Sequence, residues 1–441
     1  MKENKAISGF SKLTRDEKVA WLRGQIELDD SMAGLMASFE PARSEWREII
    51  AGLSENYLTS FHLPFGLAPN FLINGSMKVF PLVTEESSVV AAMAKAASFW
   101  ARRGGFHTDI IGVEKKGQLH FEWKGDPSLL RRLFPEIRAA LLNEVAPFSG
   151  KMTRRGGGIL HMELKYLPEI LPGYYQIDVA FDTKDAMGAN FINSCLEQFG
   201  RSLKQFMEQR SALPEADRQV DVIMAILSNY VPDNRVKVWV ECPVSELSEA
   251  GDAMTADHFA GRFVRAVTIA QKDVSRAVTH NKGIFNGIDA LALATGNDFR
   301  AIEAGGHAYA SRTGQYAGLS EAKAEAGKFR FSMELPLAVG IVGGVTTVHP
   351  LAKLAMQILE NPDARELMQY MAAAGLASNW SALRALVSEG IQKGHMKMHL
   401  GNILNSLGAT DEQKQSAGLY FQNREVSFAE VEHYLKNYAG R

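Results

Sequence analysis

The sequence predicts an α+β protein in which a small module, built on an antiparallel sheet, is inserted into a larger and mainly helical domain. Apolar residues have helical spacing over residues 10–50 and over most of the chain after residue 240. Between these regions, apolar and polar residues alternate in short stretches that are typical of strands. A chain of 441 residues also exceeds one ordinary domain, and domains of ~150 residues would give about three.

A helix with start and stop signals is predicted after Thr84. Thr84 is a good N-cap, and Glu85 and Glu86 would lie in the first turn, where the helix dipole favours acidic side chains. Apolar residues continue at helical spacing as far as Trp100, and Gly104-Gly105 then ends the helix.

The inserted module is predicted from the changes of period that follow. Residues 115–117 (Lys-Lys-Gly) are expected to form a hairpin turn, because apolar and polar residues alternate after them up to Trp123. Asp126-Pro127 then opens a helix, and a second helix follows Asp185. Two more alternating stretches lie between these helices, at 160–166 and 175–181. The order strand-strand-helix-strand-strand-helix predicts an antiparallel sheet with two helices on one face.

These patterns set the expected domain boundaries. Residues 1–107 and 221–388 would form the large domain, and residues 108–220 the inserted module. Residues 389–441 are polar and contain short helices, so we expect a separate C-terminal segment that can move.

Composition excludes several classes of protein. The 48 Lys and Arg residues nearly balance the 50 Asp and Glu residues, and a net charge of −2 provides no field that would collect nucleic acid or anionic lipid. Two cysteines, Cys195 and Cys242, favour a reducing compartment and cannot form a structural zinc site alone. The longest uncharged apolar stretch, residues 335–348, is shorter than the ~18 residues of a membrane span, and no signal peptide is expected. We therefore expect a soluble cytoplasmic protein with no metal.

Three charged segments are candidates for chemistry. Glu85 and Glu86 are either a solvated first turn or functional acids within an apolar segment. Lys282, between Asn281 and Gly283, is either a surface lysine or a partly buried ammonium that stabilises an oxyanion. Asp298 is most simply an N-cap, although it could also form a charge cluster with Arg300 and Glu303.

Histidines and glycine-rich loops complete the set of candidates. His395 and His399 would share one helix face, but no third zinc ligand is evident, so His395 is a better general acid than a ligand. Residues 156–158 and 185–190 do not have Rossmann spacing. The second loop nevertheless leads into a helix N-terminus, which can bind a phosphate through free N–H groups.

Taken together, these segments resemble the HMG-CoA reductases, in their class II bacterial form. The resemblance covers about residues 55–405. The matching segments, in family order, are Val83-Thr84-Glu85-Glu86 with Ser88-Val89-Val90-Ala91, Asp185-Ala186-Met187-Gly188-Ala189-Asn190, Arg276-Ala277-Val278-Thr279-His280-Asn281-Lys282-Gly283-Ile284, Ala294-Thr295-Gly296-Asn297-Asp298 through Ala308-Tyr309-Ala310, Gly343-Gly344 with His349-Pro350-Leu351-Ala352, and Gly394-His395-Met396.

The resemblance implies a four-electron reduction of HMG-CoA to mevalonate and free CoA by two NAD(P)H molecules. It implies a large CoA- and substrate-binding domain, a small ferredoxin-like and non-Rossmann dinucleotide-binding domain, a C-terminal helical flap, and a homodimer with active sites at the subunit interface. Matched by position, the catalytic residues would be Glu86, Lys282, Asp298 and His395. Substrate would be contacted by Ser88, Arg276 and Asn286, and the nucleotide by Asp185, Met187, Gly188, Asn190 and Asn229.

The expected roles agree with the chemistry. Lys282 would offset the oxyanion formed by hydride attack on a thioester, and Asp298 would hold Lys282 in place. Glu86 would donate a proton to the final alcohol if burial keeps its carboxyl neutral. His395 would protonate the leaving CoA thiolate, because histidine ionises near neutral pH.

Two positions depart from the family pattern, and several alternatives stay open. Thr59 replaces a glycine of the Glu-Asn-x-x-Gly motif, and Gly401 lies where a basic residue is common.

The basic residues Lys151, Arg154 and Arg155 favour NADPH over NADH through its 2′-phosphate, although they could be an ordinary basic loop. The same residues would serve mevalonate oxidation with NAD. Other readings are a Schiff-base lysine at Lys282 and a degenerate acyl-CoA-binding protein.

Overall fold

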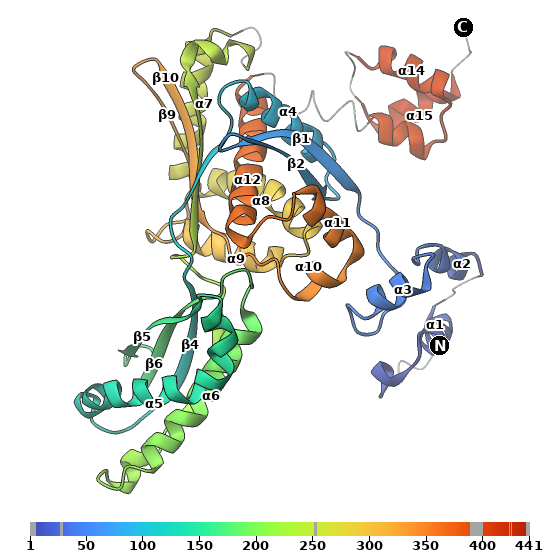
Figure 1. The fold of residues 1–441 in the computed structure, drawn as a ribbon. Helices are drawn as coiled ribbons and strands as arrows, with labels where there is room; N and C mark the ends of the chain where they lie inside the picture. The colour runs from blue at the N-terminus through green and yellow to red at the C-terminus, as the bar shows by residue number, and fades with distance from the viewer. Residues whose placement is uncertain are drawn as a thin grey trace.

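The computed structural model describes residues 6–26, 30–250, 254–388, 400–422, 424 and 426–437 (Figure 1). The helices are α1 Arg15–Gln25, α2 Asp30–Ser38, α3 Ser44–Ala51, α4 Val89–Ala101, α5 Pro127–Arg154, α6 Ala189–Glu208, α7 Ala256–Lys272, α8 Val274–Ala294, α9 Phe299–Ala310, α10 Gly344–Val348, α11 Pro350–Ile358, α12 Ala364–Val387, α14 Asp411–Tyr420 and α15 Phe428–Lys436. The strands are β1 Phe65–Ile73, β2 Ser76–Val83, β3 His107–Ile110, β4 Lys115–Glu122, β5 Gly158–Tyr166, β6 Tyr174–Asp182, β7 Asp221–Ser228, β8 Arg235–Pro243, β9 Ser320–Glu325 and β10 Lys328–Pro336.

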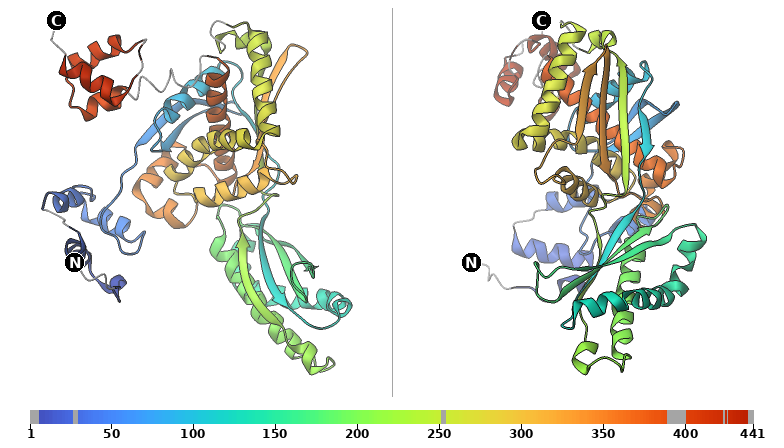
Figure 2. Two further views of the ribbon diagram at one scale, coloured as in Figure 1. Left: turned by 180° about the vertical axis from the view of Figure 1, so that it is seen from behind. Right: turned by 90° about the vertical axis from the view of Figure 1, so that its left-hand side faces the viewer.

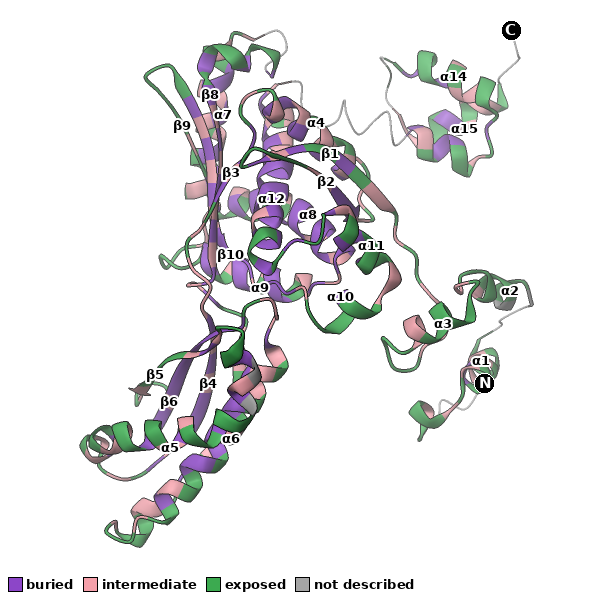
Figure 3. Cartoon of the chain, viewed as in Figure 1, coloured by how far each residue is buried: buried purple, intermediate pink, exposed green. Residues whose placement is uncertain are grey.

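The larger part of the molecule, here called the large unit, combines a sheet with a layer of helices. Its antiparallel sheet has the strand order β3-β8-β10-β9, and the hairpin β1–β2 lies beside α4 (Figure 2). α12 packs against α8 and α4, and buried residues run along much of its length (Figure 3). Its Trp380 anchors the aromatic core, with its ring centroid 4.8 Å from those of both Trp100 and Phe263. A helix that is apolar on most sides is expected to lie inside a core, as α12 does.

The second part, here called the small unit, is a four-stranded antiparallel sheet with the order β5-β6-β4-β7. α5 and α6 pack against each other and against this sheet, and a separate core of buried residues fills the space between them. As predicted, Asp126 caps α5, and its carboxylate accepts a hydrogen bond from the N–H of Ser128 at 2.9 Å.

The expected hairpin turn at residues 115–117 is wrong. These residues lie inside β4, which pairs with β6 and β7, whereas β3 pairs with β8 in the sheet of the large unit. Gly117 is needed for close packing, because a Cβ atom there would lie 2.6 Å from Leu196 Cδ1 of α6. The sheet also continues past the expected boundary at residue 220, since β7 is one of its strands.

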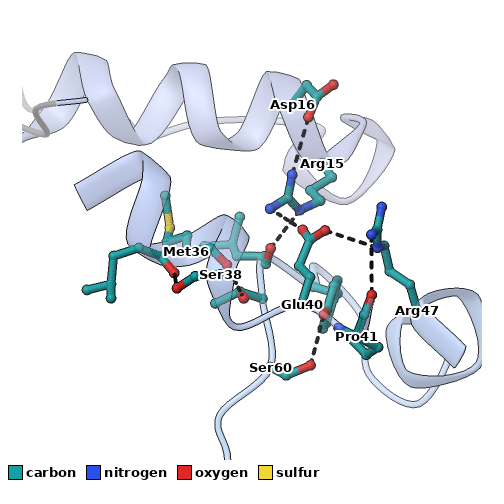
Figure 4. Close-up of polar contacts among 12 residues, drawn as sticks. Arg15, Asp16, Met36, Ser38, Glu40, Pro41, Arg47 and Ser60 are labelled. Carbon is teal, nitrogen blue, oxygen red and sulfur yellow. Dashed lines mark hydrogen bonds and ion pairs between the residues drawn. The ribbon is translucent and has the colours of Figure 1, made fainter. Parts of the chain in front are cut away.

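The N-terminal helices are held together by Glu40, whose side chain is only 9% exposed. Arg15 and Arg47 reach its carboxylate from two sides (Figure 4), and Arg47 Nε lies 3.1 Å from Oε2. Arg15 Nε also donates a hydrogen bond to the carbonyl oxygen of Leu58 at 2.7 Å. Two guanidinium groups therefore compensate one nearly buried carboxylate, the condition under which a buried charge is tolerated.

The C-terminal helices have a small core of their own. α14, α15 and the helical residues 400–406 bury Leu404, Ala417 and Val431 among their apolar side chains.

Among the helices that the structure describes, none is long and apolar enough to cross a membrane.

Gly117→Ala should lower the thermal unfolding midpoint, because the added methyl group would overlap α6 where β4 packs against it. The expected cost is about 1–3 kcal/mol, which corresponds to several degrees. Gly24→Ala is the matched control, because nothing lies within 4 Å of its Cβ position and the site is helical. Equal midpoints for the two variants, measured by circular dichroism, would contradict this account of β4.

Candidate active site

Helix α8 presents a row of polar side chains along one face. Lys282, Asn286 and Asp289 are separated by four and three residues, so they follow one another on the same side of the helix. Lys282 Nζ donates a hydrogen bond to Glu86 Oε2 and forms an ion pair with it. The side chains are 59% and 36% exposed, so this pair is open to water.

The segment that carries Glu86 differs from the expectation at its helix start. α4 begins at Val89, and its N-cap is Ser88 in the left-handed conformation with φ 76°. Thr84 is not the N-cap; its hydroxyl oxygen instead accepts a hydrogen bond from the N–H of Glu86 at 3.1 Å. Glu85 and Glu86 therefore precede the helix. A serine at positive φ is strained, and such strain is concentrated at functional sites.

Asp298 caps α9, as its simplest interpretation predicted. Its carboxylate accepts a hydrogen bond from the N–H of Ala301 at 3.2 Å and pairs with Arg300 at 3.1 Å. The expected pair between Asp298 and Lys282 is not formed. Within the described residues, Lys282 forms its ion pair with Glu86 instead. A carboxylate beside four free N–H groups is drawn to the helix start, which explains the difference.

Asp298 lies with three of the predicted nucleotide-binding residues around a cavity of about 610 Å³. Met187, Gly188 and Asn190 line it together with Asp298, and so does Leu293 from the face of α8 that carries Lys282. Gly188 is the N-cap of α6 with φ 92°, and no side chain caps that helix. The N–H groups of the first turn therefore remain available to an anion, which suits the phosphates of a dinucleotide.

A second cavity, of about 540 Å³, is lined by Asp185 and Arg155 among other residues. Asp185 has a structural task, since its Oδ1 accepts a hydrogen bond from the N–H of Ala364 at 3.1 Å, at the start of α12. Its carbonyl oxygen accepts another from Ile341 at 2.8 Å. Val342 lines both cavities, so the two cavities adjoin each other at this residue.

The remaining predicted residues are not gathered at these cavities. Arg276 is partly buried beside His280, and burial lowers the pKa of its guanidinium. Arg154 is exposed at the end of α5. Asn229 is exposed after β7, where its carbonyl oxygen approaches Gly305 of α9 so closely that a Cβ atom there would lie 2.7 Å away. His395 lies outside the described residues.

Comparison with known proteins agrees with the motifs. The model of the hydroxymethylglutaryl-coenzyme A reductase family matches residues 23–400. The 3-hydroxy-3-methylglutaryl-coenzyme A reductase of Archaeoglobus fulgidus is 34% identical over 411 residues, which cover 92% of this chain and 88% of the relative. The probable reductase of Borreliella burgdorferi is 31% identical over 362 residues, or 82% of this chain and 79% of the relative.

Solved structures agree as well. The reductase of Streptococcus pneumoniae aligns with a TM-score of 0.71 and 36% identity, covering 98% of this chain and 100% of that one. The chain belongs to the hydroxymethylglutaryl-coenzyme A reductase family. A class II enzyme of the same organism, solved bound to NADPH in open conformations, aligns with a TM-score of 0.71 and 35% identity over 96% of this chain and 99% of that one. The predicted family and an oxidoreductase function are confirmed.

Both departures from the reductase family's pattern fit their surroundings. Thr59, at a glycine position of the motif, does not have a positive φ, and its hydroxyl donates a hydrogen bond to the carbonyl oxygen of Met36 at 2.6 Å. Gly401 lies in a helical stretch with open space at its Cβ position. The threonine therefore needs no glycine conformation and adds a contact.

His280, inside the motif that carries Lys282, has a structural role in the reductase. Its Nε2 lies 2.6 Å from Ser320 Oγ, whose hydroxyl donates to Asn379 Oδ1 at 3.0 Å. Ser320 must therefore accept a hydrogen bond from Nε2–H of His280. Burial lowers the pKa of the imidazole to about 3, so the ring is neutral near pH 7.

Sequence reasoning missed a carboxyl pair in the reductase. Burial raises the pKa of Asp289 to about 8, and the charge and hydrogen bond of Glu303 on α9 and the charge of Glu85 add to this effect. The signal was available, because Asp289 lies seven residues after Lys282 and so shares its helix face. Among the described residues, no group of three or more His, Cys, Asp or Glu side chains could hold a metal ion.

Asp289→Asn should remove a pH-dependent loss of stability. A carboxyl whose pKa rises on folding from 3.8 to about 8 binds its proton more tightly in the folded state, so stability falls as pH rises between these values. We expect the thermal midpoint of the variant to exceed that of the wild type more at pH 8 than at pH 5. Asp109→Asn, at an exposed position on β3, is the control. Equal pH slopes for both variants would refute the assignment.

Proposed function

We propose that this protein reduces HMG-CoA to mevalonate and CoA with two molecules of NADPH. The observation that carries the proposal is the ion pair of Lys282 with Glu86. The two residues belong to motifs that lie far apart in the sequence, and the fold brings them into contact. Family membership supports the activity, and the NADPH-bound neighbour supports the cofactor.

Lys282 and Glu86 would carry the polar chemistry at the reacting carbonyl. The ammonium of Lys282 would stabilise the oxyanion that forms when a hydride adds to the thioester. Glu86, which forms an ion pair with that ammonium in the structure, would have to take up a proton before it could complete the alcohol. Ser88 and Asn286 are near these two residues in sequence and would orient the substrate.

Asp298 and His395 would act at the edges of the reaction. Asp298 lines the cavity of about 610 Å³ and would fix its wall opposite the nucleotide loop. His395 would protonate the CoA thiolate, which must leave before the second reduction can start. Arg276 would meet a negatively charged group of the substrate.

The residues around the cavity fit a dinucleotide. NADPH, when bound, would supply the hydride. The uncapped start of α6 would receive its phosphates, and Met187, Gly188 and Asn190 would line its pocket. Asp185 would shape this loop through its contact with α12, and Asn229 would lie at its edge. Arg154 and Arg155 would meet the 2′-phosphate.

We also propose the domain roles and the assembly. The large unit, residues 1–110 and 229–388, would bind the CoA substrate, and the small unit, residues 111–228, would be the ferredoxin-like nucleotide-binding domain. Residues 389–441 would be the flap that carries His395. The protein would act as a homodimer. Reduction is favoured over mevalonate oxidation by the basic loop, and over a degenerate CoA-binding protein by the intact ion pair.

Lys282→Ala should abolish turnover without unfolding the protein, because the side chain is 59% exposed. We expect HMG-CoA-dependent NADPH oxidation to fall about 10²–10³-fold, the scale for loss of an oxyanion partner. Lys95→Ala, at an exposed position of α4, is the control. Retained activity in Lys282→Ala, or a borohydride-trapped adduct with a carbonyl substrate, would contradict the proposal.

NADPH should support a kcat/KM about tenfold above that of NADH, and Arg155→Ala should reduce the NADPH value while sparing the NADH value. A charge-assisted contact of Arg155 with the 2′-phosphate, which NADH lacks, would explain the preference of the wild type, and its loss would explain the effect of the variant. Initial rates with each cofactor, in both reaction directions, measure this. A clear preference of the wild type for NADH would overturn the cofactor assignment and favour the degradative direction.

A further inference from the structure

Lys115, the first residue of β4, carries a buried ammonium. The residue is 6% exposed, and its Nζ donates hydrogen bonds to oxygen atoms on two other segments of the chain. The distances are 2.8 Å to Thr183 Oγ1, 2.7 Å to the carbonyl oxygen of Ala186 and 3.1 Å to that of Met187. The carbonyl oxygen of Val339 lies 3.2 Å away. None of these partners is a carboxylate, so backbone and hydroxyl dipoles hold the charge.

These contacts connect the two units at the site. Thr183, Ala186 and Met187 belong to the loop after β6 in the small unit, whereas Val339 follows β10 in the large unit. A buried charge is costly unless its donors are satisfied, and here three N–H groups face four oxygens. Separating the two segments would leave an ammonium without part of its shell.

The segment around Val339 leads directly to Asp298. The N–H of Gly340 donates a hydrogen bond to Asn297 Oδ1 at 2.9 Å, and Asn297 is the residue before Asp298. A Cβ atom on Gly340 would lie 2.3 Å from the backbone nitrogen of Met187. The nucleotide loop and the support of Asp298 are therefore in backbone contact beside the ammonium.

We propose that Lys115 is a positioning residue for cofactor binding, whose ammonium holds the loop at Ala186 and Met187 against Val339. This inference depends on the proposed function, because it assumes that residues 186–190 bind the nucleotide. Lys115 does not line the cavity of about 610 Å³, and it acts through the backbone of the loop that does. Substrate binding at Lys282 should depend on it much less.

The charged surroundings of Lys115 predict a pH signature. Burial lowers the pKa of its ammonium to about 8, against the opposing charges of Asp182 and Asp185. The other charged groups around the adjoining cavity are Arg155, Lys184, Asp363 and Arg365. As pH rises through about 8, Lys115 loses its proton and one donor, so nucleotide binding should weaken. The arginines keep their charge over this range.

The test compares Lys115→Met with Lys116→Met. Methionine keeps the length of the side chain but removes the ammonium. Lys116, the next residue of β4, pairs with Asp233 at 2.9 Å and contacts neither loop in this way. We expect Lys115→Met to raise the NADPH Kd, by fluorescence titration, and the NADPH KM about tenfold. The KM for HMG-CoA should stay within twofold, and Lys116→Met should resemble the wild type.

A second measurement needs no turnover. Hydrogen–deuterium exchange of the protein without ligands should be faster in Lys115→Met at residues 183–190 and 337–342, and unchanged in Lys116→Met. The wild-type NADPH Kd should rise between pH 7.5 and 9, a rise of several fold that Lys115→Met lacks because it has lost the titrating group. If Lys115→Met does not fold, Lys115→Gln, which keeps two N–H donors, replaces it and should give a smaller increase in Kd.

Two results would overturn the inference. One is an unchanged NADPH Kd and unchanged exchange in a folded Lys115→Met. The other is an equal increase of both KM values, which would indicate general destabilisation. A wild type that oxidises no NADPH with HMG-CoA would instead overturn the proposed function, while the exchange experiment would still report whether Lys115 joins the two segments.

Discussion

The candidate site depends on one contact between backbone segments. The loop after β6 in the small unit meets the segment after β10 in the large unit, where Ala186 and Val342 form a bridge and the N–H of Ile341 donates to Asp185 at 2.8 Å. Gly340 allows this approach, since any side chain there would overlap Met187. Because Met187, Gly188 and Asn190 come from one unit and Asp298 from the other, the cavity between them exists only while this contact holds.

The small unit could largely be predicted from local patterns, but the strands β1, β2, β9 and β10 of the large unit and the partners of the strands could not. The periodicity and the Asp126 cap located α5 correctly, because these signals depend on nearby residues. Residues 107–122 contain two strands, as alternation suggested, yet they join different sheets. Gly117 resembled a turn residue because sequence alone does not reveal that α6 packs directly over it. Pairing across long sequence separations is determined by such packing rather than by propensity.

The same limit applies to the site. The motifs identified Glu86 and Lys282, which are 196 residues apart in sequence, but not that they would pair with each other. The resemblance placed Asp298 beside Lys282, whereas the structure has it capping α9 and pairing with Arg300, as the local sequence had indicated. Lys115 had no signal at all, because its four oxygen partners are mostly backbone atoms whose positions depend on tertiary structure.

Lys115 and Lys282 show how the same type of side chain serves different purposes in different surroundings. Lys115 is buried among dipoles, so its charge is already compensated and has little left to offer a reacting group. Lys282 is 59% exposed and, within the described part of the chain, pairs with the carboxylate of Glu86, an arrangement that is weak in water, where two charges 4 Å apart interact by about 1 kcal/mol. At an effective dielectric constant of about 20 the same interaction is about 4 kcal/mol. A bound thioester that displaces water from Lys282 would therefore strengthen the field at its own carbonyl, so the open pair would gain its strength from the proposed substrate.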